Sequence, residues 1–264
     1  MYTFEYQRPA TRADASAAVD ADSRYLAGGQ SLIQAMRLRL SMSQRLVDLG
    51  AIADLKGIQV GPDRVTIGAM TTHAAVAASA ELRNAVPALA ELAEGIGDPM
   101  VRNMGTIGGS VANADPAACY PAALVGLGAT VHTATRQIDA DGFFLGLYET
   151  ALQPGELITA ISFPVIKKAA YVKFKQPASR FALIGVFVSQ GPAGVRVGVT
   201  GAKGSVFRAT PIEQALAANF TPEAAKAVTL PTDDINSDMH GSAAYRAAMI
   251  SVMASRAVAA ALAR

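Results

Sequence analysis

Two glycine pairs, set far apart in the chain, constrain its folding more than any other feature. The first lies in the run Ala27-Gly28-Gly29-Gln30-Ser31, and the second lies in Gly105-Thr106-Ile107-Gly108-Gly109-Ser110. Glycine adopts positive φ without strain and lets a backbone approach a bulky ligand closely. Successive free N–H groups in such a turn form a concave anion site. The two turns together predict one dianionic ligand held from two sides, such as the pyrophosphate of a dinucleotide.

The first glycine turn is expected to join a short strand at 25–27 to a helix. Ser31 is predicted to cap this helix, which places Leu32, Ile33, Met36 and Leu40 on one face. The N–H groups would then lie at a helix N-terminus, where the macrodipole favours phosphate. The run has no third glycine, so it does not match the nicotinamide-type fingerprint.

Each turn also has a purely structural interpretation. A glycine pair on its own often only ends a strand. The second turn could be a tight connection in which the hydroxyls of Thr106 and Ser110 satisfy their own backbone. From spacing alone, both interpretations stay open.

With 264 residues, the chain is longer than one average domain, and its patterns divide it into three parts. Residues 1–53 and 54–165 alternate short strands and helices. Residues 166–264 begin with long alternating strands and end with helices. This order predicts an α+β fold in which a two-part ligand-binding unit precedes a C-terminal antiparallel sheet backed by helices.

Composition excludes several classes of function. The net charge of +2 gives no basic face for nucleic acid, and only 17% of residues are charged, which suggests surface buried against partner chains. Cys119 is the only cysteine, so the chain alone forms no disulfide framework and holds no iron–sulfur cluster. The three histidines are isolated from one another and show no zinc spacing.

The chain is expected to be cytoplasmic and to have no membrane span. Its N-terminus has no secretory signal pattern, and Arg246 and Arg256 interrupt the alanine-rich stretch at 243–263.

No catalytic residue and no metal ligand is predicted in this chain. His73 is expected on the surface of a helix, and Glu149 and Glu156 are expected on solvated turns. Asp98 and Arg102 are expected to pair near a helix end. The chemistry would then belong to an organic cofactor or to another chain, with the protein supplying position and electrostatics.

The residues around the two turns resemble the FAD signatures of the medium subunit of molybdenum hydroxylases, the family of xanthine dehydrogenases and the aerobic carbon monoxide dehydrogenase type. The main matches are the runs at 27–32 and 103–116. Further matches extend the resemblance over nearly the whole chain and lie at 68–73, 97–99, 120–123, 155–158, 173–176, 179–182 and 199–202.

The resemblance implies that residues 1–53 and 54–165 form a two-part FAD-binding domain and that the C-terminal part packs over the edge of the isoalloxazine. Residues 27–31 and 106–109 would hold the pyrophosphate and the neighbouring ribityl chain, while Lys175 would lie beside the flavin. The complete set of cofactor-binding residues it implies is Ala27, Gly28, Gly29, Gln30, Ser31, Leu32, Ile96, Gly105, Thr106, Ile107, Gly108, Gly109, Asn113, Asp115, Cys119, Ile158 and Lys175.

Two residues depart from the family pattern. Cys119 stands where relatives commonly carry an acid, so a carboxylate contact to FAD is lost. Gln30 stands where many relatives of the carbon monoxide dehydrogenase type carry histidine; it still donates a hydrogen bond but does not titrate.

The resemblance also implies partner subunits. A large subunit would carry the molybdenum cofactor, and a small subunit would carry two [2Fe-2S] clusters, in a dimer of heterotrimers. Electrons would pass from the clusters through FAD to an external acceptor. The main alternative is a regulatory or structural nucleotide-binding module without a redox role, and a further one is a stand-alone flavin oxidase.

Overall fold

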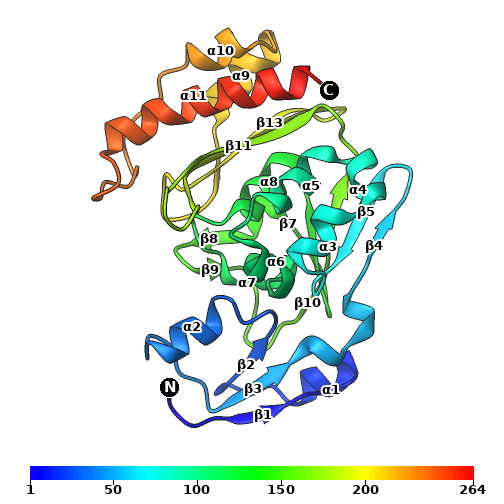
Figure 1. Cartoon of the computed structure of the whole chain (residues 1–264). Coiled ribbons are helices and arrows are strands. Elements are labelled where there is room, and N and C mark those ends of the chain that lie inside the picture. The colour runs from blue at the N-terminus through cyan, green and yellow to red at the C-terminus, as the bar shows by residue number, and fades with distance from the viewer.

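The computed structural model describes residues 1–264, and its main sheets follow one another along the chain (Figure 1). The first sheet is wholly parallel and has the order β1-β3-β2. Parallel neighbours need a crossover, which short helices supply here. Its elements are β1 (Glu5–Gln7), α1 (Arg12–Ala17), β2 (Ser23–Leu26), α2 (Leu32–Arg37), β3 (Arg45–Asp48), η1 (Leu49–Ala51) and η2 (Ala53–Leu55).

The second sheet is antiparallel, with the order β4-β5-β10-β6-β7. Its strands are β4 (Ile58–Val60), β5 (Arg64–Gly68), β6 (Thr130–Thr133), β7 (Gln137–Asp139) and β10 (Ile158–Pro164). A run of helices lies between β5 and β6. These are α3 (His73–Ala78), α4 (Ala80–Ala85), α5 (Pro87–Glu94), α6 (Pro99–Met104), α7 (Ile107–Asn113) and α8 (Cys119–Leu127). The segment between β7 and β10 adds η3 (Ala140–Gly142) and a hairpin of β8 (Phe144–Gly146) and β9 (Glu149–Thr150).

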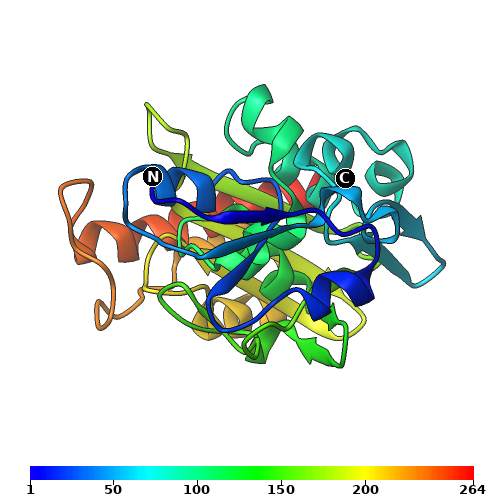
Figure 2. The ribbon, with the colours of Figure 1, turned by 90° about the horizontal axis from the view of Figure 1, so that it is seen from below.

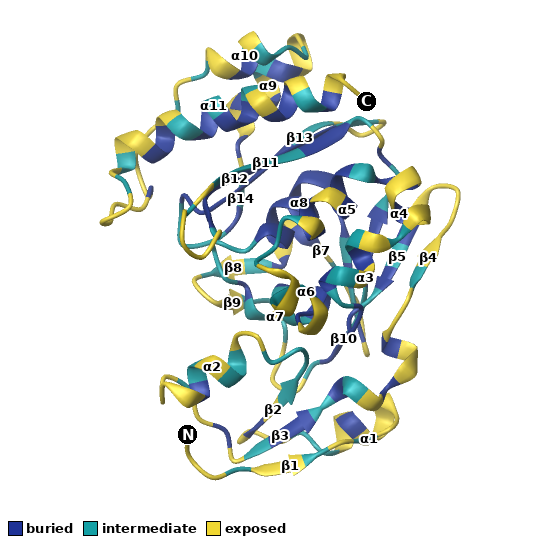
Figure 3. Ribbon diagram, viewed as in Figure 1, coloured by how far each residue is buried: buried dark blue, intermediate teal, exposed yellow.

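The third sheet is antiparallel in the order β11-β12-β13-β14. Its strands are β11 (Ala169–Lys175), β12 (Ala182–Gly191), β13 (Gly194–Thr200) and β14 (Phe207–Arg208). The helices α9 (Thr210–Ala218), α10 (Pro222–Lys226) and α11 (Ala243–Leu262) cover one face, while α8 packs against β12 and β13 from the other side (Figure 1). Because both faces are covered, residues 182–188 of β12 are all buried (Figure 3).

The α+β fold class is confirmed, since helices and mainly antiparallel sheets form separate layers. The largest hydrophobic cluster joins the second sheet to α5 and α8, and another joins the third sheet to α9–α11. A small cluster that includes Val47, Met70 and Leu157 lies where the first part meets the second. The first sheet lies in front of the other layers when the molecule is seen from below (Figure 2). No helix combines the length and the apolar character needed to cross a membrane.

The helix after the first glycine turn differs from its prediction. It ends at Arg37, and of its predicted face only Met36 is buried, while Leu40 is 80% exposed. Ser31 occupies the N-cap position, but its side chain makes no capping hydrogen bond. The amphipathic pattern therefore predicted a longer and more deeply buried helix than the one in the structure.

Candidate functional site

A cavity of about 670 Å³ lies between the first part of the chain and the second. This volume is within the range of small-molecule and cofactor sites. Its wall comes mainly from the end of β2 with the first glycine turn, the stretch from Ala69 to His73, the segment from Ile96 to Ala118, and the loop at 152–158. The glycine turns that are far apart in sequence therefore face one space.

The two glycine turns touch each other. A Cβ atom at Gly28 would stand 2.0 Å from the carbonyl oxygen of Met104 and 2.8 Å from the Cα of Gly105. A Cβ atom at Gly109 would stand 3.1 Å from that of Ala27. Gly29 has a φ of +70°, in the left-handed region that favours glycine. Only glycine at position 28 allows this contact between the backbones.

The first turn presents free backbone donors. The N–H groups of Gly28, Gly29, Gln30 and Ser31 meet no acceptor in the protein, whereas the carbonyls of Gly29 and Ser31 accept hydrogen bonds inside α2. The side chain of Gln30 folds back and donates to the Gly28 carbonyl at 3.3 Å. Unpaired, successive amides beside a cavity suit an anionic ligand.

The second turn is satisfied internally. The N–H groups of Ile107 and Gly108 donate to the carbonyls of Thr71 and Ala69 at 3.1 and 2.8 Å. The Thr106 hydroxyl accepts from the N–H of Gly109 at 3.1 Å. The structural interpretation of this turn, in which the hydroxyl bonds to the backbone of its own turn, therefore holds for Thr106. The second turn forms a wall of the cavity rather than a row of free donors.

His73 was predicted on the surface, and this is wrong. Its side chain is 5% exposed, lines the cavity, and lies with its ring centroid 5.3 Å from that of Tyr120. Burial first, and the charge of Arg102 second, lower the pKa of His73 to about 4, so the imidazole is neutral at physiological pH. Its Nδ1 atom is buried and has no hydrogen-bond partner in the protein.

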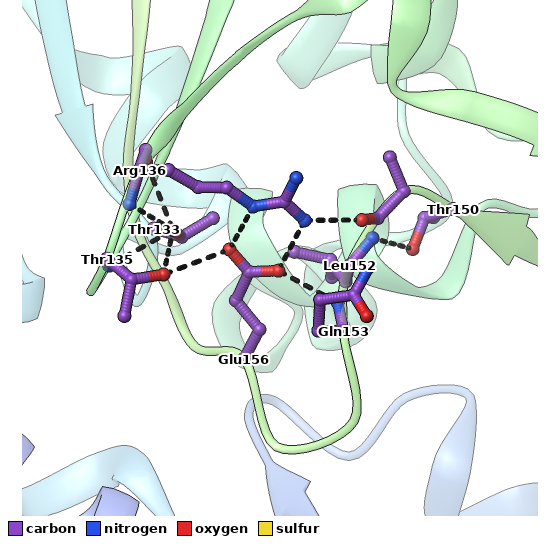
Figure 4. A network of polar contacts seen from close by, with 8 residues as sticks. Thr133, Thr135, Arg136, Thr150, Leu152, Gln153 and Glu156 are labelled. Atoms are coloured by element: carbon purple, nitrogen blue, oxygen red, sulfur yellow. Dashed lines mark hydrogen bonds and ion pairs between the residues drawn. The ribbon is translucent and has the colours of Figure 1, made fainter.

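Glu156 was predicted on a solvated turn, and this is also wrong. Its side chain is 5% exposed and forms a two-point contact with Arg136, with Nε–Oε1 and Nη2–Oε2 distances of 2.8 and 2.7 Å (Figure 4). The hydrogen bond from Arg136 is the main reason why the pKa of Glu156 falls to about 2. Arg136 also donates to the Ala151 carbonyl, and Glu156 accepts from the N–H of Gln153. The network fixes the cavity-lining loop at 152–158. Glu149 is exposed as predicted, although it lies in the short strand β9.

Asp98 and Arg102 do not pair. Asp98 caps α6 by accepting from the N–H of Val101 at 2.8 Å. Arg102 instead donates to the carbonyls of Ile96 and Gly97 at 3.0 and 3.1 Å. It thereby holds the turn that carries Ile96 into the cavity wall.

Arg24 is the one arginine on the cavity wall, and it takes part in none of the ion pairs of the structure. It lies on β2, just before the first glycine turn. The wall also carries the carboxylates of Asp115 and Glu156, of which Glu156 is neutralised by Arg136. The free positive charge thus lies on the wall of the same cavity as the unpaired amides.

Most of the predicted site residues lie around this cavity. Those that line it are Ala27, Gly28, Gly29, Gln30, Ser31, Leu32, Ile96, Gly105, Thr106, Gly108, Gly109, Asn113, Asp115 and Ile158. Three others do not line it. Ile107 is fully buried, Cys119 is buried at the start of α8, and Lys175 is exposed at the end of β11.

Sequence reasoning did not select Arg24, His73 or the loop at 152–157 as site residues. The loop carried a signal, because Gly155 and Glu156 belong to a run that resembles the family. His73 carried the same kind of signal, because it ends the matching run at 68–73, whereas nothing in the sequence pattern marked Arg24 as a cavity residue. The structure contains no cluster of three or more metal-ligating His, Cys, Asp or Glu side chains.

Comparison with known proteins identifies the family of the chain. Residues 2–166 match the family model described as the FAD binding domain in molybdopterin dehydrogenase. The carbon monoxide dehydrogenase medium chain of Afipia carboxidovorans is 38% identical, over 99% of this chain and 98% of that protein. The nicotine 6-hydroxylase medium subunit of Paenarthrobacter nicotinovorans is 33% identical, over 96% of this chain and 95% of that protein.

A solved structure shows the same fold. A chain of the carbon monoxide dehydrogenase from Hydrogenophaga pseudoflava, in a form that lacks the Mo-pyranopterin moiety of its molybdenum cofactor, superposes with a TM-score of 0.90. It is 34% identical and is matched over 99% of this chain and 98% of that chain. The chain described here therefore belongs to the family of FAD-binding medium subunits of molybdenum hydroxylases.

Proposed function

We propose that FAD binds in the cavity between the two glycine turns, with its pyrophosphate against the first turn. The observation that carries this placement is the row of unpaired N–H groups from Gly28 to Ser31, which lies on the wall of the same cavity as the unpaired Arg24. Backbone donors and a guanidinium together suit a dianion. When bound, FAD supplies one- and two-electron redox chemistry, which none of the side chains of the cavity wall provides.

The other walls would position the cofactor. The second turn would lie against the cofactor with its backbone. The Asn113 side chain makes no hydrogen bond within the protein and would be available to a polar group of the cofactor. Ile96 and Ile158 offer apolar surface for a ring system. His73 contributes an uncharged imidazole, which adds no positive charge to the site at neutral pH.

Membership of the family makes the chain a subunit of an oxidoreductase complex and favours a redox role over a regulatory or structural nucleotide-binding module. We infer that a large molybdenum subunit and a small subunit with [2Fe-2S] clusters are its partners. Electrons would leave through FAD to an external acceptor, and the complex would be a cytoplasmic dimer of heterotrimers. Exposed apolar side chains support burial against partners: Met100 and Met104 on α6, and Leu145 and Leu147 on the β8–β9 hairpin.

Isolation of the native complex tests this assignment. We expect the chain to co-purify with a cysteine-rich iron–sulfur subunit and a molybdenum-containing large subunit, identified by mass spectrometry and metal analysis. A flavin-loaded chain that purifies alone and reduces oxygen would instead support a stand-alone oxidase. A chain that purifies without flavin and takes up none would contradict the placement of FAD.

A further inference from the structure

One lysine of the C-terminal sheet reaches the FAD-binding part of the chain. Side chains alternate along β11, so Tyr171, Lys173 and Lys175 share one face. Val172 and Phe174, on the opposite face, pack into the cluster beneath α9–α11. Lys173 therefore points away from the C-terminal helices and toward α5 and α8.

The ammonium group of Lys173 joins two segments behind the cavity wall. Its Nζ donates to the Gly95 carbonyl at 2.8 Å and lies 3.4 Å from the Sγ of Cys119. Gly95 is the C-cap of α5, so the positive charge lies at the helix end that favours cations. Gly95 directly precedes Ile96, and Cys119 directly follows Ala118; both of these neighbours line the cavity.

The turn that carries Ile96 is held from a second direction by Arg102. This guanidinium donates to the carbonyls of Ile96 and Gly97, and Gly97 adopts a φ of +50°. Two cations therefore bind three successive carbonyls of one turn. Arg102 belongs to α6, within the FAD-binding part, whereas Lys173 belongs to the C-terminal sheet.

We propose that Lys173 is a positioning residue through which the C-terminal sheet fixes the cavity walls at Ile96 and Ala118 and so sets the affinity and environment of the flavin. The inference rests on the proposed binding of FAD in this cavity. Lys173 itself does not line the cavity, so it acts through Gly95 and Cys119. Hydrogen bonds from a charged donor are stronger than neutral ones and hold their acceptors in place.

The full-length chain offers a matched pair of lysines for the test. Lys173→Met keeps an apolar stem but removes the ammonium, and Lys167→Met makes the same change at an exposed position outside the predicted cofactor-binding set. FAD titration, followed by fluorescence and by visible circular dichroism of the bound flavin, should show roughly tenfold weaker binding for Lys173→Met, the effect of losing one hydrogen bond from a charged donor. The dichroism spectrum should also change. Lys167→Met should match wild type in both.

A double-mutant cycle adds a readout that a general loss of stability does not reproduce. Cys119→Asp gives Lys173 a carboxylate partner and should hold or improve FAD affinity. The same substitution in the Lys173→Met background leaves the carboxylate without its cation, so the double variant should bind FAD more weakly than Lys173→Met alone. If Lys173→Met does not fold, Lys173→Gln serves in both comparisons, because its shorter amide also lacks the charge.

The outcomes separate this inference from the proposed function. If the wild-type chain binds no FAD, the proposed function is contradicted. If wild type binds FAD and the Lys173 variants match it in affinity and dichroism, or if the effect of Cys119→Asp does not depend on Lys173, only the positioning role is overturned.

Discussion

Gly28 lies against the backbone of Met104 so closely that a Cβ atom at residue 28 would stand 2.0 Å from the Met104 carbonyl oxygen. This contact joins the first glycine turn to the residue that precedes the second. Gly28 and Gly105 both line the cavity, so the contact keeps the free amides of the first turn beside it.

Gly28→Ala should therefore separate the two turns. Overpacking against a backbone that cannot retreat costs about 1–3 kcal/mol, so we expect a lower melting temperature and at least roughly tenfold weaker FAD binding. Gly204→Ala is the matched control, because a Cβ atom there meets nothing within 4 Å. FAD affinity unchanged in Gly28→Ala would show that the contact between the turns does not shape the site.

Arg24→Met should weaken FAD binding and make it less sensitive to salt. The unpaired guanidinium attracts a dianion through a partly solvated cavity, and salt screens such an attraction. Affinity measured at low and high ionic strength should show a smaller salt effect in the variant than in wild type. Arg256→Met removes an exposed arginine of α11, and it should leave the FAD affinity and its salt dependence unchanged. An equal salt effect in wild type and Arg24→Met would place the pyrophosphate away from Arg24.

Glu156→Gln should loosen the loop at 152–158. The variant loses the carboxylate contact with Arg136, and we expect a loss of about 1–2 kcal/mol in the free energy of unfolding, allowing for solvent around Arg136, whose side chain is 42% exposed. Because the pKa of Glu156 is lowered in the folded state to about 2, this stability is present above its ordinary pKa of 4.5 and disappears as pH falls toward 2. Urea unfolding across that window measures it. Glu149→Gln, at an exposed position, should show no such difference from wild type.

His73 should make the flavin-free chain less stable in mild acid. The unfolded chain binds a proton at His73 near pH 6.5, but the folded chain does so only near pH 4, so stability is lost as pH falls between these values. In urea unfolding, wild type should lose roughly 2–3 kcal/mol more than His73→Phe over this window. If the free energy of unfolding falls equally in wild type and His73→Phe between pH 6.5 and pH 4, the burial of a neutral imidazole at position 73 is contradicted.

The sequence pattern was sufficient for the elements that bury a regular apolar face or end at a glycine. The short strand before the first glycine turn, the alternating strands that open residues 166–264 and the helices that follow them lie close to their predicted places. The division at residues 53 and 165 stays a prediction, which the separate main sheets support. The prediction for the helix after Ser31 was wrong at Leu40, which lies beyond the end of the helix and is exposed. Apolar residues at helical spacing do not need to be buried when the helix is short.

The site was predictable where it consists of backbone and less so where it depends on tertiary contacts. Glycine pairs indicate close backbone approach, so both turns were found. His73 looked like a surface residue because its burial comes from Tyr120 and Gly105, which are distant in sequence. The family motif singled out Lys175 as a residue beside the flavin. Lys173 lies two residues earlier on the same face of β11 and makes the contact with Gly95.

Titration of the purified 264-residue chain with FAD tests whether the cavity between the two glycine turns holds this cofactor. We predict that one FAD binds per chain, with the visible absorbance of a protein-bound flavin, and that Gly28→Ala lowers the affinity while Gly204→Ala does not. A wild-type chain that is folded by circular dichroism yet shows no flavin absorbance, as purified or after incubation with FAD, would contradict the binding of FAD in this cavity.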